Sequence, residues 1–355
     1  MLLHDLVLKK KQAVSGITSN PTLDAFDLEF CEILDDLATT DQFVKERVNE
    51  TVKELELAAR IDYNSHYKTA FDSYNEAVCY YLLQSKECVV SHVPESSVPT
   101  PDFEVKFTIK GEEIPRFVFL EVKSLSFAGN NLQYRKVQQD SLEMHISMEK
   151  QRKRGKRVCS GFYEVSPLGD KAVGLTSEIE ILIKKIDQNI KEGQYKNEKG
   201  QDTILFVDLS QFIFPFEMCE CLPIFPDILR KCSESGRLWM LAFGRIGERI
   251  YTCCEFPGKK NFDVDLQQHG ILERYEFIKG IIFGTGSQQG KKKLYGLYRS
   301  KDDDTDAVAF MRKVCDFVND DKNSWGYEYF DNLERSLFAR WKVSKASEDP
   351  NSTNK

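Results

Sequence analysis

Two stretches of the chain alternate apolar and polar residues with the period of a half-buried β-strand. The first covers residues 101–107 and the second residues 117–123. Between them, Gly111 can adopt positive φ in a turn over residues 110–113. The pattern therefore predicts a β-hairpin with apolar positions on one face, and its charged positions include Asp102, Glu104, Lys106, Glu121 and Lys123.

The charged end of this hairpin has two interpretations. Phe117 and Phe119 fall on the same face as Glu121 and Lys123, because side chains two residues apart in a strand point the same way. This favours charges at the mouth of a packed surface. The alternative is a ladder of opposite charges across an exposed hairpin.

Helical periodicity dominates the chain before the hairpin. Residues 24–37 and 41–60 are predicted helices, the second with Asp41 at its N-cap. Residues 1–60 are therefore expected to form an N-terminal helical subdomain. Its apolar spacing indicates packing or an oligomer surface rather than chemistry.

The next predicted helix, residues 62–85, has a broad apolar stripe and a second, smaller apolar face. Glu76 lies on the second face with Cys79 and Leu83. A helix covered on both sides would partly bury Glu76, whereas a helix covered on one side would leave it solvated. The stripe itself consists of Tyr67, Ala70, Phe71, Tyr74, Val78 and Tyr81.

The remaining pattern predicts an α/β fold with a mixed central sheet flanked by helices. Residues 203–209 form a continuous apolar run typical of a central buried strand. Further strands are expected at residues 88–91, 158–165, 238–244, 249–254, 277–283 and 293–298, and further helices at 131–154, 177–191 and 308–319. The expected divisions are 1–60, a core over 61–300, a helical segment over 301–343 and a disordered tail over 344–355.

Composition narrows the class of protein. The chain has 355 residues and a net charge of −7, which argues against a surface that is basic throughout. Its apolar runs are too short to cross a bilayer and its N-terminus lacks a signal-peptide pattern, so no membrane partner and a cytoplasmic location are expected. The ten cysteines are then expected to be reduced, buried thiols rather than disulfides or a zinc site.

One segment reverses the sign of the chain. Residues 150–157 are almost entirely basic, a pattern that suits sequence-independent contact with nucleic-acid phosphates. A solvated helix end is the alternative, because cations also favour the C-terminal end of the helix dipole. The candidate binding residues are Lys150, Arg152, Lys153, Arg154, Lys156 and Arg157.

The hairpin charges suit metal-dependent phosphodiester hydrolysis. Mg²⁺ prefers carboxylate oxygens, water and phosphate as ligands, and Asp102 and Glu121 on adjacent strands could chelate one ion. Lys123, on the same face as Glu121, could orient the attacking water or offset charge on the phosphate. Glu76 could bind a second ion or hold the first through water.

The order of these residues resembles the PD-(D/E)XK nuclease superfamily, whose fold is called restriction-endonuclease-like. Glu76 on a helix is followed by Pro101-Asp102 and then by Glu121-Val122-Lys123, and the two acids of the hairpin are 19 positions apart. The resemblance implies Mg²⁺-dependent cleavage of nucleic acid, usually DNA, with Mn²⁺ as a substitute, with Asp102 and Glu121 as metal ligands and Lys123 as the catalytic lysine. Many members carry a glutamine and a tyrosine four apart on the next helix, whereas Gln138 and Gln139 are followed here by Leu142 and Glu143.

Three hypotheses follow. The first is a Mg²⁺-dependent DNA endonuclease, suited to restriction or phage defence and expected to be a homodimer if it cuts both strands. The second is a catalytically inert nucleic-acid-binding module that keeps the nuclease fold. The third is an interaction protein in which the charges of the hairpin are structural.

Overall fold

The computed structural model describes residues 2–14, 21–58, 65–94, 99–126, 131–160, 175–195, 200–212, 217–227, 232–252, 264–286 and 291–322. Its centre is a seven-stranded mixed sheet with the order β1-β2-β3-β4-β7-β8-β9. The strands are β1 (Val89–His92), β2 (Phe103–Phe107), β3 (Arg116–Ser124), β4 (Thr203–Asp208), β7 (Gly280–Gly284), β8 (Leu294–Tyr298) and β9 (Phe317–Asp320).

The relative direction of neighbouring strands changes across this sheet. β1, β2 and β3 form an antiparallel meander, and β3, β4 and β7 are parallel to one another. β8 is antiparallel to β7, and β9 is parallel to β8. A separate two-stranded antiparallel sheet consists of β5 (Ile224–Asp227) and β6 (Cys232–Ser235).

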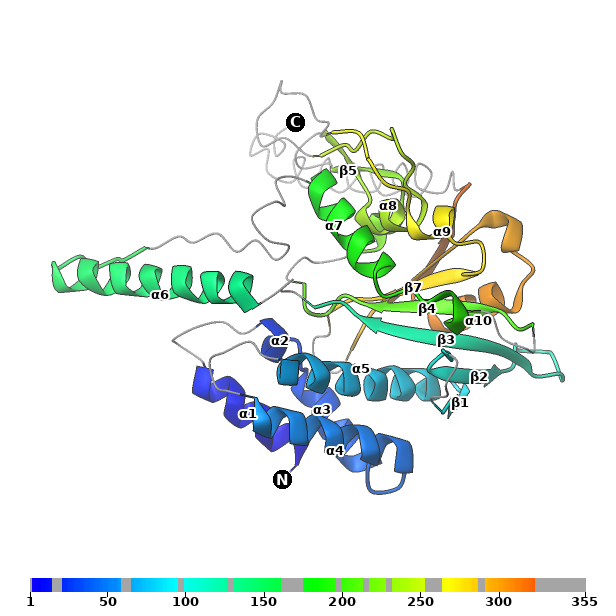
Figure 1. The fold of residues 1–355 in the computed structure, drawn as a ribbon, viewed down its shortest axis with the longest axis horizontal. Helices are drawn as coiled ribbons and strands as arrows, with labels where there is room; N and C mark the ends of the chain where they lie inside the picture. The colour runs from blue at the N-terminus through cyan, green and yellow to red at the C-terminus, as the bar shows by residue number, and fades with distance from the viewer. Residues whose placement is uncertain are drawn as a thin grey trace, which may run out of the picture.

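Helices cover both faces of the central sheet (Figure 1). The helices before the hairpin lie on one face, and α7, α8 and α9 lie on the other (Figure 1). Their bounds are α1 (Leu3–Val14), α2 (Pro21–Asp24), α3 (Leu28–Leu37), α4 (Gln42–Leu57), α5 (Ser65–Ser85), α6 (Asn131–Lys153), α7 (Leu175–Asp187), α8 (Arg237–Phe243), α9 (Ile271–Arg274) and α10 (Asp306–Val314).

The pleat of the sheet separates two hydrophobic cores. In β4, Ile204 and Phe206 belong to the core shared with α1–α5 and α10, whereas Leu205 and Val207 belong to the core shared with α7, α8 and α9. A strand buried on both faces is continuously apolar, as predicted for this segment. The helices of residues 1–60 pack into the first core without a break.

The hairpin and the helix before it agree with the sequence prediction. Phe103, Val105 and Phe107 are fully buried on one face of β2, and Gly111 has a φ of +95° in the turn. In α5, Cys79 and Leu83 are as buried as the apolar stripe. The expectation that this helix is covered on both sides is therefore confirmed.

Several predicted elements are wrong. Residues 238–244 are not a strand: α8 occupies Arg237–Phe243, where the run is buried all round and so carries no period to separate helix from strand. The helix expected over residues 308–319 ends at Val314, and Phe317–Asp320 joins the sheet as β9. Asp27 accepts hydrogen bonds from the amides of Glu29 and Phe30 as an N-cap, which interrupts the helix expected over residues 24–37.

Two other predicted strands have little support. In residues 249–252, the pairing reduces to one bridge between Arg249 and Asp265, and residues 253–254 lie outside the described residues. Residues 158–160 are not in a strand, and 161–165 are not described. The tail over residues 344–355 also lies outside the described residues.

α6 stands apart from the two layers and projects away from them (Figure 1). It contains 23 residues, so at about 1.5 Å per residue it is about 35 Å long. Among the described helices, none is both long and apolar enough to span a bilayer.

Candidate active site

The site lies where β3 extends beyond the end of its neighbour β2. The last pair between these strands is Phe103 with Leu120, so the amide of Val122 meets no backbone partner of β2. The Asp102 carboxylate takes its place and accepts a hydrogen bond from this amide at 2.6 Å. Asp102 is thereby fixed beside the carboxyl-terminal end of β3, at the same level as Glu121.

Glu121 is fully buried. Its Oε1 is in close contact with Lys123 Nζ and accepts a hydrogen bond from Gln194 Nε2 at 2.5 Å. Its Oε2 is buried and has no hydrogen-bond partner among the described residues. Burial, and then the charge of Asp102, raise the pKa of Glu121 to about 7, against the opposing effect of Lys123. A buried carboxylate oxygen without a donor is unusual and implies a missing partner.

Glu76 approaches from α5. Its Oε2 lies 3.5 Å from a guanidinium nitrogen of Arg47 on α4, and its side chain is 26% exposed. Burial, followed by repulsion from Asp102, raises the pKa of Glu76 to about 8. Glu76 is thus partly buried, which is the first of the two alternatives that the sequence left open. Its ion-pair partner, Arg47, comes from a helix to which the sequence assigned only packing.

A polar cavity of about 200 Å³ opens at this end of β3. It is lined by Lys68, Asp72, Glu76, Asp102, Val122, Lys123, Ser124 and Asn189. Glu121 does not line it, but its carboxylate contacts Lys123. Three of the four predicted catalytic side chains therefore share one cavity, and the fourth contacts the third directly.

Asp72 also lines the cavity, although it is not among the site residues predicted from the sequence. It lies one helical turn before Glu76 on α5, so the spacing of four residues could have indicated it. Burial raises the pKa of Asp72 to about 6, while Lys68, the Ser124 hydroxyl and Lys123 lower it. Arg47, Gln194 and Asn189 come from segments far from the hairpin, and the sequence offers no signal that would place them here.

Whether this cluster suits a metal ion can be judged from its donors. Within the described ranges, no three His, Cys, Asp or Glu side chains already converge as a metal site. The donor set nevertheless fits a hard cation, since Oε2 of Glu121 has no described partner and the repulsion from Asp102 raises the pKa of both glutamates. A divalent cation bound by oxygen ligands would relieve both features.

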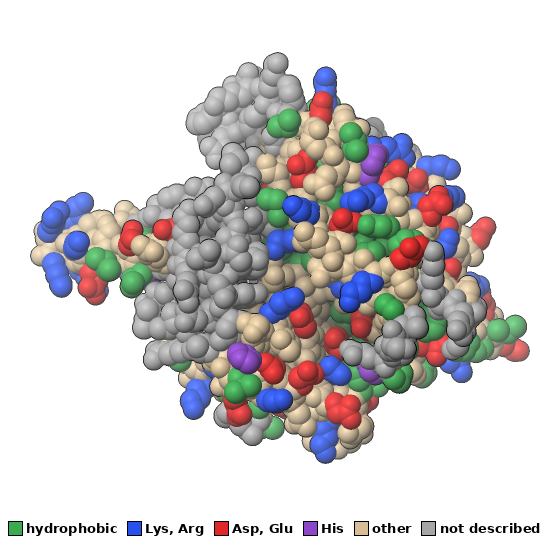
Figure 2. All heavy atoms as spheres, in the orientation of Figure 1, with side chains coloured by type: hydrophobic (Ala, Val, Ile, Leu, Met, Phe, Trp, Pro, Cys, Tyr) green, Lys and Arg blue, Asp and Glu red, His purple; other side chains and the backbone are tan. Residues whose placement is uncertain are grey.

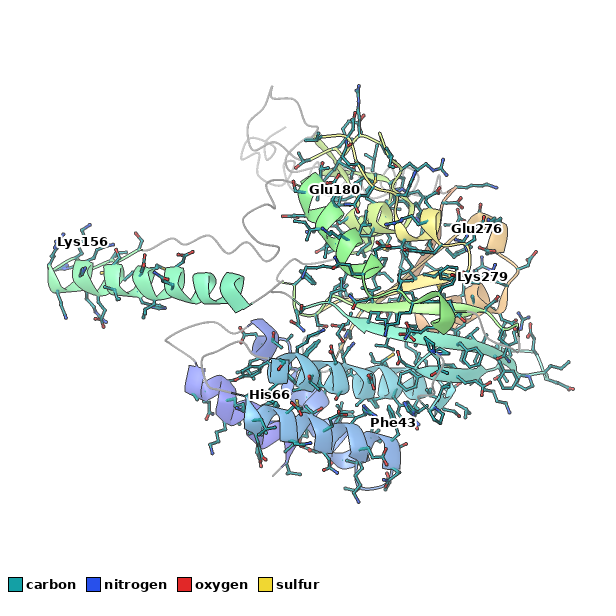
Figure 3. The ribbon with its side chains drawn as sticks, in the orientation of Figure 1. Phe43, His66, Lys156, Glu180, Glu276 and Lys279 are labelled. Atoms are coloured by element: carbon teal, nitrogen blue, oxygen red, sulfur yellow. The ribbon has the colours of Figure 1, made fainter. Side chains whose placement is uncertain are left out.

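The predicted nucleic-acid-binding residues do not join this cluster. They are exposed at and just beyond the end of α6, where Lys156 marks the distal tip (Figure 3). Figure 2 shows Lys and Arg side chains gathered there. Gln139 donates to Glu143 on the same helix at 3.0 Å, so its amide is directed along α6; the side chain of Gln138 lies outside the described residues.

The comparisons with known proteins do not assign this chain to a family. A scan against protein-family models, a search of curated proteins and a search of solved structures each found no match.

Proposed function

We propose that the protein is a Mg²⁺-dependent nuclease that hydrolyses phosphodiester bonds of DNA. The observation that carries the proposal is the meeting of Glu76, Asp102 and Lys123 at one polar cavity, with Glu121 in contact with Lys123. Further support comes from the order of elements. A helix carrying Glu76 precedes the hairpin, and the sheet is mixed, as the resemblance to PD-(D/E)XK nucleases implies.

In this function Asp102 and Glu121 would hold Mg²⁺, which supplies neutralisation of charge on the phosphate when bound. Asp102 is fixed by the Val122 amide, and Glu121 offers its unpartnered Oε2. Lys123 lines the cavity and contacts Glu121. Its ammonium can donate hydrogen bonds to a phosphate oxygen or to the attacking water.

Glu76 adds a pH-dependent component. A pKa of about 8 means that it retains a proton at neutral pH, so it can hydrogen-bond to an oxygen in the cavity as a donor. Binding of a cation there requires loss of this proton. Metal affinity is therefore expected to increase as the pH rises from about 6 to above 8.

The test is a cleavage assay on plasmid and single-stranded DNA with Mg²⁺ or Mn²⁺. Asp102→Asn and Lys123→Met should each lower the rate by about 10²-fold or more. Glu104→Gln and Lys106→Met are matched controls. They make the same charge changes on β2, at residues that do not line the cavity, and should retain activity. Metal-independent cleavage, or equal effects in both sets, would contradict the proposal.

The other hypotheses correspond to distinct results of the same assay. DNA binding without cleavage would indicate an inert nucleic-acid-binding module, and neither binding nor cleavage would indicate an interaction protein. If plasmid is cut across both strands, two active sites are required, and we expect a homodimer on a sizing column.

A further inference from the structure

A buried ion pair joins β4 to the segment before β8, and neither of its residues lines the cavity. Asp208, at the end of β4, contacts Lys292, which precedes β8, and their side chains are 0% and 3% exposed. Desolvation of two charges costs several kcal/mol per ion in general, and well-packed apolar residues often serve stability as well or better. A pair buried this completely therefore calls for a role beyond stability.

The backbone is shaped to admit this lysine. A Cβ on Gly284, at the end of β7, would lie 2.8 Å from Cε of Lys292 and 2.9 Å from the Phe206 ring. The absence of a side chain at Gly284 leaves the space that the lysine stem fills. Nζ lies 5.9 Å from the centroid of the Phe206 ring, so the cation is held from several sides.

From Lys292 a chain of hydrogen bonds leads into the cavity. Nζ donates to Oδ1 of Asn75 at 3.1 Å, and Nδ2 of Asn75 donates to Oγ of Ser124 at 2.9 Å. Ser124 lines the cavity, and its hydroxyl hydrogen-bonds with the carboxylate of Asp72, lowering the pKa of Asp72. The chain thus joins the buried pair to a cavity carboxylate.

The direction of these hydrogen bonds follows from the amide of Asn75, whose oxygen accepts from Lys292 and whose NH₂ group donates to Ser124. Burial lowers the pKa of Lys292 to about 7. With its oxygen accepting from Asn75, Ser124 has its single O–H left to donate to Asp72. Every proton in the chain therefore points toward the cavity.

Asp72 also faces charges within the cavity. Lys68 lies on its own helix and Lys123 on β3, and both lower its pKa, whereas burial raises it. Glu76, on the same helix, has its pKa raised by Asp72. Ser124 differs from these charges because it lowers the pKa of Asp72 through a hydrogen bond, which is directional.

We propose that Asp72 is a working carboxylate of the cavity and that Lys292 is its positioning residue, acting through Asn75 and Ser124. Asp72 would accept a hydrogen bond from a water in the cavity while Ser124 holds its other oxygen. This inference rests on the proposed nuclease function and names residues outside the motif that suggested it.

The experiment measures Mg²⁺-dependent turnover of the full chain in a double-mutant cycle. Ser124→Ala removes the hydroxyl through which the series of hydrogen bonds reaches the cavity. Asp208→Asn with Lys292→Met removes the buried ion pair without leaving one charge alone. Each should lower turnover about 10- to 100-fold, as loss of outer-shell partners does. Their combination should be little worse than either, because both interrupt one chain.

The matched control is a second buried ion pair remote from the cavity, Arg237 with Glu220, whose side chains are 13% and 7% exposed. Arg237→Met with Glu220→Gln should leave turnover unchanged at a temperature where both proteins are folded. Additive effects of Ser124→Ala and the Lys292 pair, or equal loss in this control, would overturn the proposal.

A second measurement does not depend on cleavage. Titration of the ¹³C-labelled Asp72 carboxylate should give a higher pKa in Ser124→Ala than in the native protein, because the donor that favours the anion is lost. No change would overturn the chain from Lys292 to Asp72. If the native protein shows this titration but does not cleave DNA, the nuclease proposal fails while the chain stands. Ser124→Ala serves both measurements if the Lys292 double variant does not fold.

Discussion

Asp102 and Glu121 are adjacent because of a simple feature of strand pairing. β2 begins one residue after Asp102, so its carboxylate replaces the ladder hydrogen bond that a strand residue would have made with Val122. The alternation of residues along two neighbouring strands was sufficient to predict that Asp102, Glu121 and Lys123 gather. It could not predict that Glu121 would be fully buried and would accept a hydrogen bond from Gln194, because Gln194 lies far along the chain.

The elevated pKa of Glu121 makes a prediction about stability. Its pKa is about 7 in the folded protein against an ordinary value of 4.5, so between these values the folded state binds more protons than the unfolded state. The stability from this group is complete below about pH 4.5 and is lost as the pH rises through 7. Glu121→Gln should therefore gain stability relative to the native protein as the pH rises from 5 to 8.

The measurement is the free energy of unfolding by urea at the two pH values. Any effect of the substitution on packing is present at both, so only the difference between them reports the titration. A difference that is constant or reversed in sign would show that the pKa of Glu121 is not raised.

At the scale of elements, the sequence predicted best where period and length agreed. The hairpin, α5, β4 and β8 were found because each pattern fits one structure. α8 was predicted as a strand because Leu238–Gly244 is apolar at nearly every position, and all but one of its residues are fully or nearly fully buried in the second core. β9 was missed because Phe317 and Val318 continue the apolar spacing of α10, and only tertiary pairing with β8 separates them.

Asp41 links local sequence to the site through α4. Its Oδ1 caps the helix by accepting from the Val44 amide at 3.0 Å, and its Oδ2 accepts from the Tyr80 hydroxyl at 2.9 Å. Asp41→Ala should destabilise the protein by about 1–2 kcal/mol, the usual cost of losing an N-cap plus part of a hydrogen bond.

Asp41→Asn is the control for this substitution, because asparagine caps a helix as well as aspartate does and should recover most of the loss. Because Arg47 of α4 forms the ion pair with Glu76, the alanine variant should also lower the rate of cleavage. Thermal unfolding with a parallel activity assay measures both, and equal stability of the two variants would exclude a capping role.

At the scale of the whole molecule, the basic tip lies at the far end of α6, which projects away from the sheet (Figure 1), and no residue of α6 lines the cavity. If both contact DNA, they contact it at different places. The tip would then contribute affinity that is independent of sequence, and the cavity would contribute chemistry. The sequence placed both in one segment but could not show that α6 leads away from the sheet.

Neutralising the tip tests this division of roles. Arg152→Gln, Lys153→Gln and Arg154→Gln together should weaken DNA binding and reduce the slope of log Kd against log salt concentration by up to about 0.9 per lost phosphate contact. Turnover at saturating DNA should stay unchanged. Lys45→Gln, Lys53→Gln and Lys110→Gln make the same charge change at exposed positions elsewhere, and an equal effect there would show that only net charge matters.

The isolation of α6 also has a consequence for backbone dynamics. No residue of α6 whose side chain is described is fully buried, and most of the stability of a helix in a protein comes from packing of an apolar face. Its amide protons should therefore exchange with solvent orders of magnitude faster than those of β4. Deuterium uptake followed by mass spectrometry would show α6 labelled within seconds while β4 stays protected. Addition of duplex DNA should slow exchange at Lys150–Lys153 first, which would make amide protection in this helix a direct record of when the protein engages its substrate.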